Sequence, residues 1–327
     1  MNRPFRILSI DGGGIRGLIP ALVLVELERQ TGRAIADCFD LIAGTSTGGI
    51  LALGLTRPGD GGRPRYQALD LANLYLKEGQ RIFDESPGRR LTNPMGLRIA
   101  KYPPSGIEGV LADYFGESRL KEALTEVLVT AYDIEQRDAF FYRRRRALED
   151  ARYDVPMRVA ARATSAAPTY FEPALVLWPD GRDVLVDGGV FANNPAMCAY
   201  AEAWRTLAEA GQTTEDILLV SMGTGLHTEP YPYEQAKGWG VAGWAKPVLD
   251  VIFDGVADTV DYQLRQLLPA GAEGLPRYHR FQASLNAELS AMDDTSPAHL
   301  EGLRRAAEGI LQNQAAEIET LARRLAG

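Results

Sequence analysis

The stretch Leu41-Ile42-Ala43-Gly44-Thr45-Ser46-Thr47-Gly48-Gly49-Ile50 decides which fold the rest of the chain is expected to adopt. A short apolar run ends there in Gly-x-Ser-x-Gly, and an apolar helical pattern follows at once. This order is typical of a sharp strand-to-helix turn with a reactive serine at its centre. A Cβ atom at Gly44 or Gly48 would crowd the turn. The Ser46 hydroxyl would lie at the edge of a sheet, beside a helix N-terminus that stabilises negative charge. The alternative is a plain Gly/Ser-rich loop, because so short a pattern often arises by chance.

The composition is that of a soluble globular protein large enough for a sizeable core. Of the 327 residues, 46% are hydrophobic and 24% are charged, and we find no internal repeat or low-complexity linker. We therefore expect one domain, residues 1–327, with a helical C-terminal part from about residue 234. The net charge of −8 argues against binding to a nucleic-acid polymer. Cys38 and Cys198 form no metal-binding or redox motif and are expected to be small buried side chains in a reducing compartment.

The start of the chain shows no sign of export or membrane insertion. Residues 1–4 lead straight into a strand-like run, without the basic and apolar segments of a secretory signal. No stretch reaches the ~18 consecutive apolar residues expected of a membrane-spanning helix. We expect a cytoplasmic protein whose contact with the inner membrane would be peripheral.

The alternation of strand and helix patterns predicts a three-layer α/β fold with a mostly parallel sheet and helices on its faces. A buried strand over 5–10, a glycine loop over 11–17 and a helix over 18–30 precede a second strand over 39–43 and a helix to residue 55. Further strands are expected at 127–132, 139–142, 184–186, 217–220 and 278–283. Further helices are expected at 66–82, 107–115, 156–165, 195–207 and 297–325, the last as two helices or one bent one.

Two longer segments are harder to place from their patterns. Several Pro, Gly and Arg residues predict an irregular, lid-like region over 84–106. Residues 239–268 are expected to be mostly helical, and their broad apolar stripe is most simply explained by packing in the core.

The glycine loop of residues 11–17 admits two interpretations. Gly12, Gly14 and Gly17 match Gly-x-Gly-x-x-Gly between a strand and a helix, the context of a dinucleotide-binding loop. That fingerprint also needs an acidic residue at the end of the second strand, where this chain has Gly44-Thr45-Ser46 instead. Adjacent glycine N–H groups serve equally well as an oxyanion hole. We favour the oxyanion hole and keep nucleotide binding as the alternative.

A serine nucleophile needs a base, and two candidates remain. His227 follows the turn Gly223-Thr224-Gly225 and would complete the order Ser, Asp, His, whereas His279 and His299 are expected to be structural or surface residues. Asp187, at the end of its own strand and followed by Gly188 and Gly189, could approach Ser46 directly. A desolvated carboxylate has a raised pKa and can accept the proton without a histidine.

The chain resembles the patatin-like phospholipases on motifs that stand in the family's order. These are Asp11-Gly12-Gly13-Gly14-Ile15-Arg16-Gly17, Gly44-Thr45-Ser46-Thr47-Gly48-Gly49 and Asp187-Gly188-Gly189, with Ala163-Thr164-Ser165-Ala166-Ala167-Pro168-Thr169-Tyr170-Phe171 as a fourth. The resemblance covers about residues 5–225. It implies a FabD/lysophospholipase-like fold and a hydrolase without metal or cofactor that cleaves the acyl esters of phospholipids or lysophospholipids.

The resemblance also assigns roles to single residues. Ser46 would be the nucleophile and Asp187 the base of a dyad. Gly12, Gly13 and Gly14 would supply the oxyanion hole. Arg16 would support the glycine loop or meet the lipid phosphate, and the sequence does not separate these two roles. The supporting glycines are Gly44, Gly48 and Gly188.

The C-terminal third resembles a narrower group of bacterial patatin-like proteins. Residues 254–264 and 292–297 are similar to segments of phospholipase effectors of antiphage defence, which cyclic dinucleotides activate. This resemblance implies a cyclic dinucleotide activator besides the membrane phospholipid, and it leaves open both an ungated esterase and assembly into a homo-oligomer. The run Arg143-Arg144-Arg145-Arg146 is interpreted first as a solvated loop or strand end. The alternative is a patch that grips lipid head groups or nucleotide phosphates.

Overall fold

A mixed sheet of eight strands lies at the centre of the computed structural model, which describes residues 3–84, 99–179, 181–213, 217–244, 247–271 and 274–327. The strand order is β5-β6-β3-β2-β1-β7-β9, and β4 pairs with β3. The pairs linking β3, β2, β1, β7 and β9 are parallel, and those joining β3 to β4 and β6, and β5 to β6, are antiparallel. The strands are β1 (Phe5–Ile10), β2 (Leu41–Gly44), β3 (Glu126–Asp133), β4 (Asp138–Arg143), β5 (Ala174–Trp178), β6 (Gly181–Asp187), β7 (Ile217–Met222) and β9 (Tyr278–Phe281), with β8 (Leu226–His227) and β10 (Ser284–Leu285) in a separate pair.

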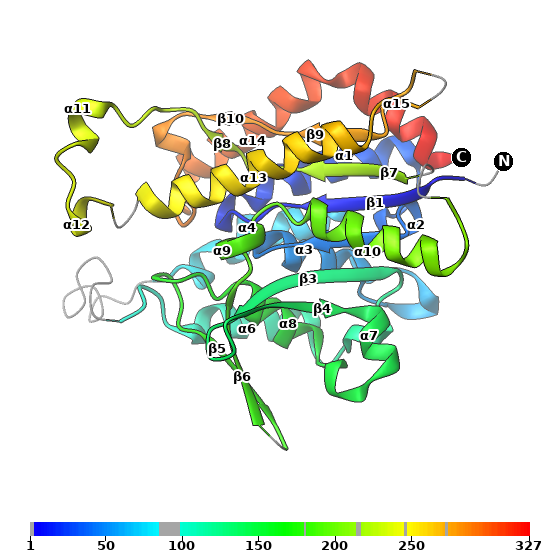
Figure 1. Ribbon diagram of the computed structural model, residues 1–327, viewed down its shortest axis with the longest axis horizontal. Coiled ribbons are helices and arrows are strands. Elements are labelled where there is room, and N and C mark those ends of the chain that lie inside the picture. The colour runs from blue at the N-terminus through cyan, green and yellow to red at the C-terminus, as the bar shows by residue number, and fades with distance from the viewer. Residues whose placement is uncertain (1–2, 85–98, 180, 214–216, 245–246, 272–273) are drawn as a thin grey trace.

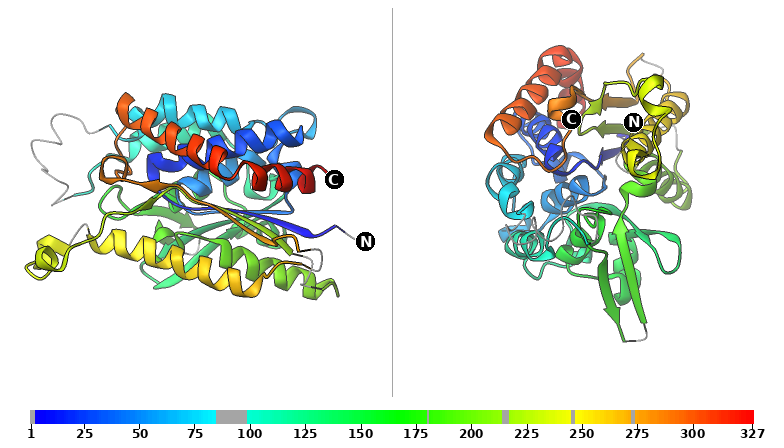
Figure 2. Two further views of the ribbon diagram at one scale, coloured as in Figure 1. Left: turned by 90° about the horizontal axis from the view of Figure 1, so that it is seen from above. Right: turned by 90° about the vertical axis from the view of Figure 1, so that its left-hand side faces the viewer.

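Helices cover both faces of this sheet, as Figures 1 and 2 show. One face carries α1 (Leu18–Thr31), α3 (Thr47–Thr56), α4 (Ala68–Ile82), α6 (Pro104–Phe115), α8 (Met157–Thr164), α14 (Pro297–Asn313) and α15 (Ala315–Ala326). The opposite face carries α10 (Ala196–Glu209) and α13 (Pro247–Leu267). The shorter helices are α2 (Ile35–Cys38), α7 (Arg144–Glu149), α9 (Gly189–Ala192), α11 (Tyr233–Ala236) and α12 (Val241–Trp244). The predicted three-layer α/β fold is confirmed.

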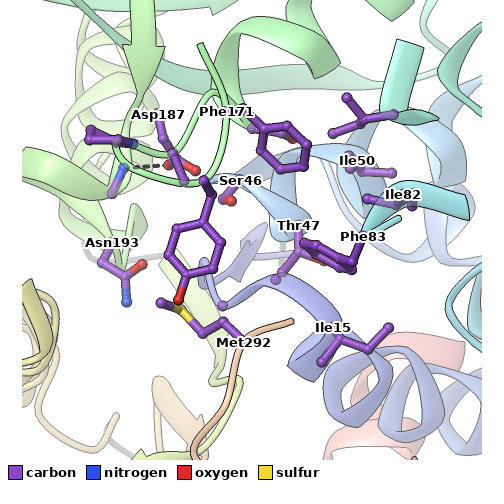
Figure 3. A pocket seen from close by; sticks show the side chains of 18 of the residues that line it. Ile15, Ser46, Thr47, Ile50, Ile82, Phe83, Phe171, Asp187, Asn193 and Met292 are labelled. Atoms are coloured by element: carbon purple, nitrogen blue, oxygen red, sulfur yellow. Dashed lines mark hydrogen bonds between the residues drawn. The ribbon is translucent and has the colours of Figure 1, made fainter. Parts of the chain in front are cut away.

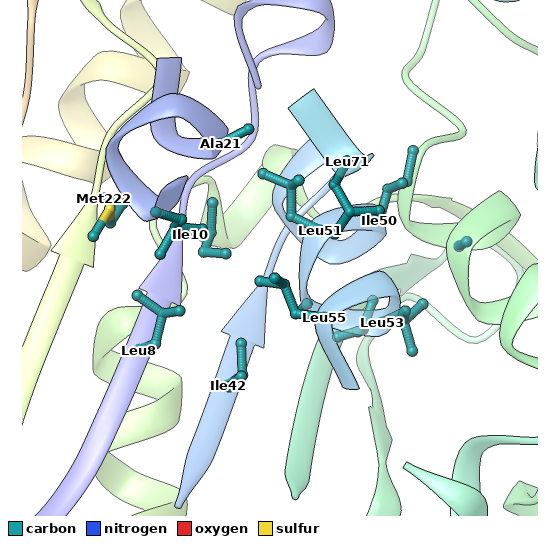
Figure 4. Packing of buried hydrophobic residues seen from close by; sticks show 14 of the residues in the cluster. Leu8, Ile10, Ala21, Ile42, Ile50, Leu51, Leu53, Leu55, Leu71 and Met222 are labelled. Carbon is teal, nitrogen blue, oxygen red and sulfur yellow. The ribbon is translucent and has the colours of Figure 1, made fainter. Parts of the chain in front are cut away.

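Alternation along the central strands explains why both faces are covered. In β1, Ile7 packs toward α10 and α13, whereas Leu8 and Ile10 pack toward α1 and α3, because successive side chains of a strand point to opposite faces. All three are fully buried. Figure 4 shows Leu8 and Ile10 on β1, with Leu51 on the neighbouring helix α3, in the cluster on one of these faces. A strand that is apolar on both sides is stable only between two helical layers.

The strands β5, β8 and β10 were not predicted from the sequence patterns. No strand was predicted between residues 166 and 183, but β5 lies there. The strand is hard to recognise because Leu175 and Leu177 point outward and are exposed, so apolarity does not alternate along it. The helical pattern of 297–325 forms two helices, one of the two predicted alternatives, and they are divided at Gln314, which has non-helical φ and ψ angles of −114° and 22°.

The apolar stripe of residues 239–268 is only partly in the core, so the core-packing interpretation is wrong for its first half. Val260 and Leu264 of α13 are buried against α10 and the sheet. Val248, Val251 and Ile252, about two to four turns earlier, are exposed.

The lid-like region predicted for 84–106 falls mostly on residues 85–98, which lie outside the described residues. Its end is regular, because α6 begins at Pro104. Just before it, Tyr102 is buried with its ring centroid 5.4 Å from that of Phe83.

The four arginines 143–146 pair with groups of the protein itself. Arg143 contacts Glu202 at 3.0 Å, Arg144 contacts Glu126 at 2.8 Å, and Arg145 contacts Glu209 at 2.5 Å. The guanidinium of Arg146 lies 3.6 Å from the ring centroid of Tyr153. The run starts at the end of β4, as one of the predicted alternatives had it, and continues into α7. Its arginines pair with groups of the protein itself, which supports neither a loose solvated loop nor a head-group patch.

None of the helices in the described part of the chain is both long and apolar enough to cross a bilayer. Cys38 is buried and Cys198 is half-buried, and both are free thiols.

Candidate active site

Ser46 stands at the turn between β2 and α3, as the sequence predicted. Its φ and ψ angles are 54° and −123°, a conformation that costs free energy for a residue with a Cβ atom. Its backbone N–H donates to the Oγ1 of Thr164 at 2.8 Å. A Cβ atom on Gly48 would lie 2.8 Å from the carbonyl oxygen of Asp11, so α3 can start this close to β1 only with glycine at that position.

The register of the sheet brings Asp187 to the same turn. Gly44, the last residue of β2, is opposite Val129 of β3, and Asp187, the last residue of β6, is opposite Ala131. Because β4 occupies the other edge of β3, β2 and β6 share one edge and meet end to end. The two strands run in opposite directions, so their carboxyl ends face each other across this point.

The carboxyl of Asp187 is buried and lines the same cavity as Ser46. It accepts the Gly189 N–H at 2.7 Å. Burial raises the pKa of Asp187 to about 7, although the bonds from Ser46 and Gly189 oppose this rise. Gly188 lets the turn lie against β3, because a Cβ atom there would meet the Thr130 side chain at 2.6 Å.

One short segment is tied to both members of the pair. Thr164, at the end of α8, accepts the Ser46 N–H through its hydroxyl. Two residues later, the carbonyl of Ala166 accepts the Asp187 N–H at 3.0 Å. Residues 164–166 therefore fix the spacing between Ser46 and Asp187. The sequence drew attention to this segment only through the family resemblance and gave it no role.

The glycine loop lies beside Ser46, but its three glycines are not equivalent. The Gly12 N–H already donates to the carbonyl of Asn193 at 3.0 Å, which does not support its predicted role in the oxyanion hole. Gly13 and Gly14 line the same cavity as Ser46, and no acceptor in the described part of the chain takes their N–H groups. Gly14 also has a φ of 59°, which favours glycine.

Arg16 supports the glycine loop from behind. Its Nε donates to the carbonyl of Gly13 at 3.4 Å. Burial lowers the pKa of the Arg16 guanidinium, and the carboxylates of Asp254 and Asp250 on α13 partly offset this. Of its two predicted roles, the structure therefore favours support of the loop.

Ser46 and Asp187 open into an apolar cavity of about 70 Å³ (Figure 3). Its wall is built mainly by hydrophobic side chains from several elements: Ile15, Ile50, Tyr75, Ile82, Phe83, Ile107, Pro168, Tyr170, Phe171, Phe253 and Met292. Asn193 adds a polar side chain close to the pair. These lining residues were not predicted, because they come together only through the fold. A wall of this kind suits an acyl chain.

The structure separates His227 from this cavity. The residue lies in β8, and its ring centroid is 6.4 Å from that of Tyr231. Within the described residues, His227 does not line the cavity and pairs with neither Ser46 nor Asp187. His279 and His299 are buried, and their Nδ1 atoms lie 2.7 Å from Glu317 and 3.1 Å from the Glu288 carbonyl. A Ser46-Asp187-His227 triad has no support in this geometry.

The geometry supports neither a dinucleotide site nor a metal site. The glycine loop faces Ser46 and an apolar wall, which does not suit the phosphates of a dinucleotide. In the described part of the chain, no group of three or more His, Cys, Asp and Glu side chains is arranged to hold a metal ion.

Comparison with known families agrees with this geometry. The family model described as patatin-like phospholipase matches residues 8–200, which include Ser46 and Asp187. The chain belongs to the patatin-like phospholipase family. It is a hydrolase that acts on ester bonds, and the predicted family is confirmed.

The similarity to individual relatives extends over nearly the whole chain. Patatin-like protein 1 of Arabidopsis thaliana is 30% identical over 338 residues, which cover 94% of this chain and 81% of that protein. Patatin-like protein 4 of the same plant is 32% identical over 334 residues, which cover 93% and 82%. Among solved structures, human GIVD cytosolic phospholipase A2 aligns with 99% of this chain and 60% of its own, at 13% identity and a TM-score of 0.45.

Proposed function

We propose that this patatin-like hydrolase cleaves the acyl esters of phospholipids or lysophospholipids through a Ser46-Asp187 dyad and an acyl-enzyme. The observation that carries the proposal is the buried pair itself. Asp187 and Ser46 line the same apolar cavity, Ser46 is one of the groups that act on the pKa of Asp187, and burial holds that pKa at about 7. A carboxylate with this pKa is a competent general base near neutral pH.

Acylation uses both residues and two amides of the glycine loop. The Ser46 Oγ forms a bond to the ester carbonyl carbon while its proton passes to the Asp187 carboxylate. The N–H groups of Gly13 and Gly14 stabilise the oxyanion that forms. When the carbon–oxygen bond to the leaving alcohol breaks, Asp187 returns the proton to that alcohol, and the acyl group remains on Ser46.

Deacylation repeats these steps with water as the nucleophile. Asp187 takes a proton from the water as its oxygen bonds to the acyl carbon, and the bond to Ser46 Oγ then breaks. Asp187 returns the proton to Ser46, and the fatty acid leaves. The apolar side chains around the cavity hold the acyl chain, so the polar head group of the lipid stays outside.

Labelling and substitution test the dyad together. A fluorophosphonate should modify Ser46, and Ser46→Ala and Asp187→Asn should each lower kcat on a phospholipid substrate by about 10³-fold or more. His227→Ala is the matched control and should retain activity. Full activity in folded Ser46→Ala would overturn the proposal, and a loss in His227→Ala as complete as that in Asp187→Asn would replace the dyad by a triad.

As a second proposal, a cyclic dinucleotide activates the enzyme, as in the bacterial effectors that residues 254–264 and 292–297 resemble. The contacts of residues 292 and 293 support such a link. The carbonyl of Met292 accepts the Ile15 N–H at 2.8 Å, and Asp293 contacts Lys101 at 2.6 Å. A ligand that shifted this segment would thus reach the glycine loop.

Phospholipid hydrolysis measured with and without cyclic dinucleotides tests this regulation, and sedimentation of the same samples measures assembly into a homo-oligomer. We expect low activity without ligand and a rise with it. High activity without any ligand would identify an ungated esterase instead.

A further inference from the structure

A group of large apolar side chains is exposed at one end of the molecule. Figure 1 shows α11 and α12 projecting from the left-hand end, beyond the first turns of α13. Val241 is 94% exposed and Tyr233 is 76% exposed, so both side chains are largely in contact with solvent. We call this surface the α11–α13 patch, and its members are Tyr233, Val241, Trp244, Val248, Val251 and Ile252.

The α11–α13 patch is held together by aromatic and polar contacts. The ring centroid of Trp239 lies 5.3 Å from that of Tyr231 and 5.1 Å from that of Trp244, both in edge-on arrangements. The Tyr231 hydroxyl donates to Asp250 of α13 at 3.0 Å. The projecting segment is therefore anchored to α13, and it presents its apolar side chains outward.

The α11–α13 patch and the catalytic cavity share helix α13. Phe253 follows Val251 and Ile252 directly on α13, and it lines the cavity together with Ser46 and Asp187. An acyl chain leaving an aggregated lipid phase would have to pass through water to reach a cavity remote from that phase. A neighbouring apolar surface removes this cost, because burial in lipid replaces contact with water.

The charges around the α11–α13 patch indicate which kind of lipid surface it fits. Residues 229–254 contain four acidic and two basic residues, and Lys237 pairs with Glu234. The net charge of the whole chain is −8. Attraction to an anionic membrane needs a basic surface, so the apolar side chains favour a zwitterionic one.

We propose that the α11–α13 patch docks the enzyme on the surface of a zwitterionic phospholipid membrane and so brings the cavity to its substrate. The inference rests on the proposed function, because the docked surface would supply the lipid that Ser46 attacks. A second copy of the chain could also cover an apolar surface, and the experiment below separates the two occupants.

Vesicle binding tests the docking directly. In a Ser46→Ala background, which prevents hydrolysis during the measurement, the protein should bind phosphatidylcholine vesicles. Val241→Asp combined with Val251→Asp should weaken this binding by about tenfold or more, because two apolar contacts are lost and two charges are added. Leu177→Asp is the matched control. Leu177 is 71% exposed in β5, on a hairpin away from α11 and α12 (Figure 1), and its substitution should leave binding unchanged.

Activity on two substrates separates this inference from the proposed function. With Ser46 intact, the double variant should lose about tenfold in the hydrolysis of vesicle phospholipid and keep its rate on a soluble short-chain ester. Circular dichroism confirms that each variant is folded. If neither substrate is hydrolysed by the wild-type protein and Ser46 is not labelled, the proposed function fails. If both are hydrolysed and the double variant acts on vesicles like the wild type, only the docking surface fails.

Two further outcomes would overturn the inference. Equal losses in Leu177→Asp and in the double variant would mean that any added charge weakens binding. Sedimentation as a dimer that the double variant dissociates, with unchanged vesicle binding, would assign the α11–α13 patch to a second copy. Replacing a fifth of the phosphatidylcholine by phosphatidylserine should not tighten binding, and a tenfold gain would contradict the zwitterionic preference.

Discussion

Burial of a single carboxyl group sets the conditions under which the proposed dyad works. Asp187 is enclosed by the turn, the cavity wall and β3, and its pKa is raised to about 7. Ser46 is strained at a positive φ of 54°, so both residues are held in states that their surroundings must enforce. Both states cost free energy in the folded protein. Substitutions at the site should therefore change the free energy of unfolding as well as the activity.

The pH dependence of turnover follows from the raised pKa of Asp187. The base must be ionised, so kcat/KM should rise with pH and level off above about 7, with a loss of about tenfold for each pH unit below that value. A pH–rate profile on a soluble ester measures this. A profile that is flat between pH 5 and 8 would show that a different group is the base.

Replacing Asp187 should stabilise the fold while it removes activity. Between the usual pKa of 3.8 and about 7 the native state holds a proton that the unfolded state releases, so the contribution of Asp187 to stability falls as the pH rises through this range. At pH 8, Asp187→Asn should therefore raise the free energy of unfolding by up to about 4 kcal/mol, and at pH 4 it should change little. Denaturant titrations at both values check this, and Ser46→Ala, which keeps the Asp187 carboxyl but removes a group that lowers its pKa, should still lose stability as the pH rises.

At the scale of elements, the turn between β2 and α3 depends on what packs around it. Gly48 lets α3 begin against β1, and Thr164 at the end of α8 satisfies the backbone of Ser46. The end-to-end meeting of β2 and β6 then supplies the base. Each contact joins elements that are far apart in the sequence.

Thr164→Val should show how much the turn depends on α8. Valine keeps the shape of threonine but leaves the Ser46 N–H without an acceptor, which should cost about 1–3 kcal/mol of stability. Displacement of the nucleophile should lower kcat by about 10- to 100-fold, with a smaller change in KM. Thr164→Ser keeps the hydroxyl and should recover most of kcat. Equal kcat values in the valine and serine variants would show that the hydrogen bond does not position Ser46.

At the scale of the whole molecule, a buried ion pair joins the C-terminal part of the chain to the glycine loop. Arg280 of β9 contacts both carboxylate oxygens of Asp11, at 3.0 and 2.6 Å, and donates to Ser221 of β7 at 2.9 Å. Burial would lower the pKa of the Arg280 guanidinium, but the charge and hydrogen bonds of Asp11 outweigh this and raise it. The pair fixes the outer strands to the end of β1.

Removing one partner of this ion pair should destabilise the molecule more than replacing both charged groups by neutral ones. Arg280→Met leaves the Asp11 carboxylate buried without a partner and should lower the free energy of unfolding by about 3–5 kcal/mol. Adding Asp11→Asn to Arg280→Met should restore much of the loss. Urea unfolding of both variants measures the difference, and a double variant no more stable than the single one would show that the strands do not depend on this charge balance.

The sequence by itself determined the local features of this protein. The strand–loop–helix order and the turn at Gly44, Ser46 and Gly48 depend on neighbouring residues, because backbone sterics and side-chain periodicity act over a few positions. The family followed from motifs of the same short range. Asp187 was identified as a candidate base by the strand end and glycines next to it, although its place beside Ser46 could not be derived from them.

Only the tertiary structure decided which distant groups meet. Sheet register places the end of β6 against the end of β2. The carbonyl of Asn193 accepts a hydrogen bond from the Gly12 N–H. The first half of α13 is exposed although its apolar pattern resembles that of a core helix. Burial and hydrogen-bond partners depend on which elements pack together, and no local pattern records that choice.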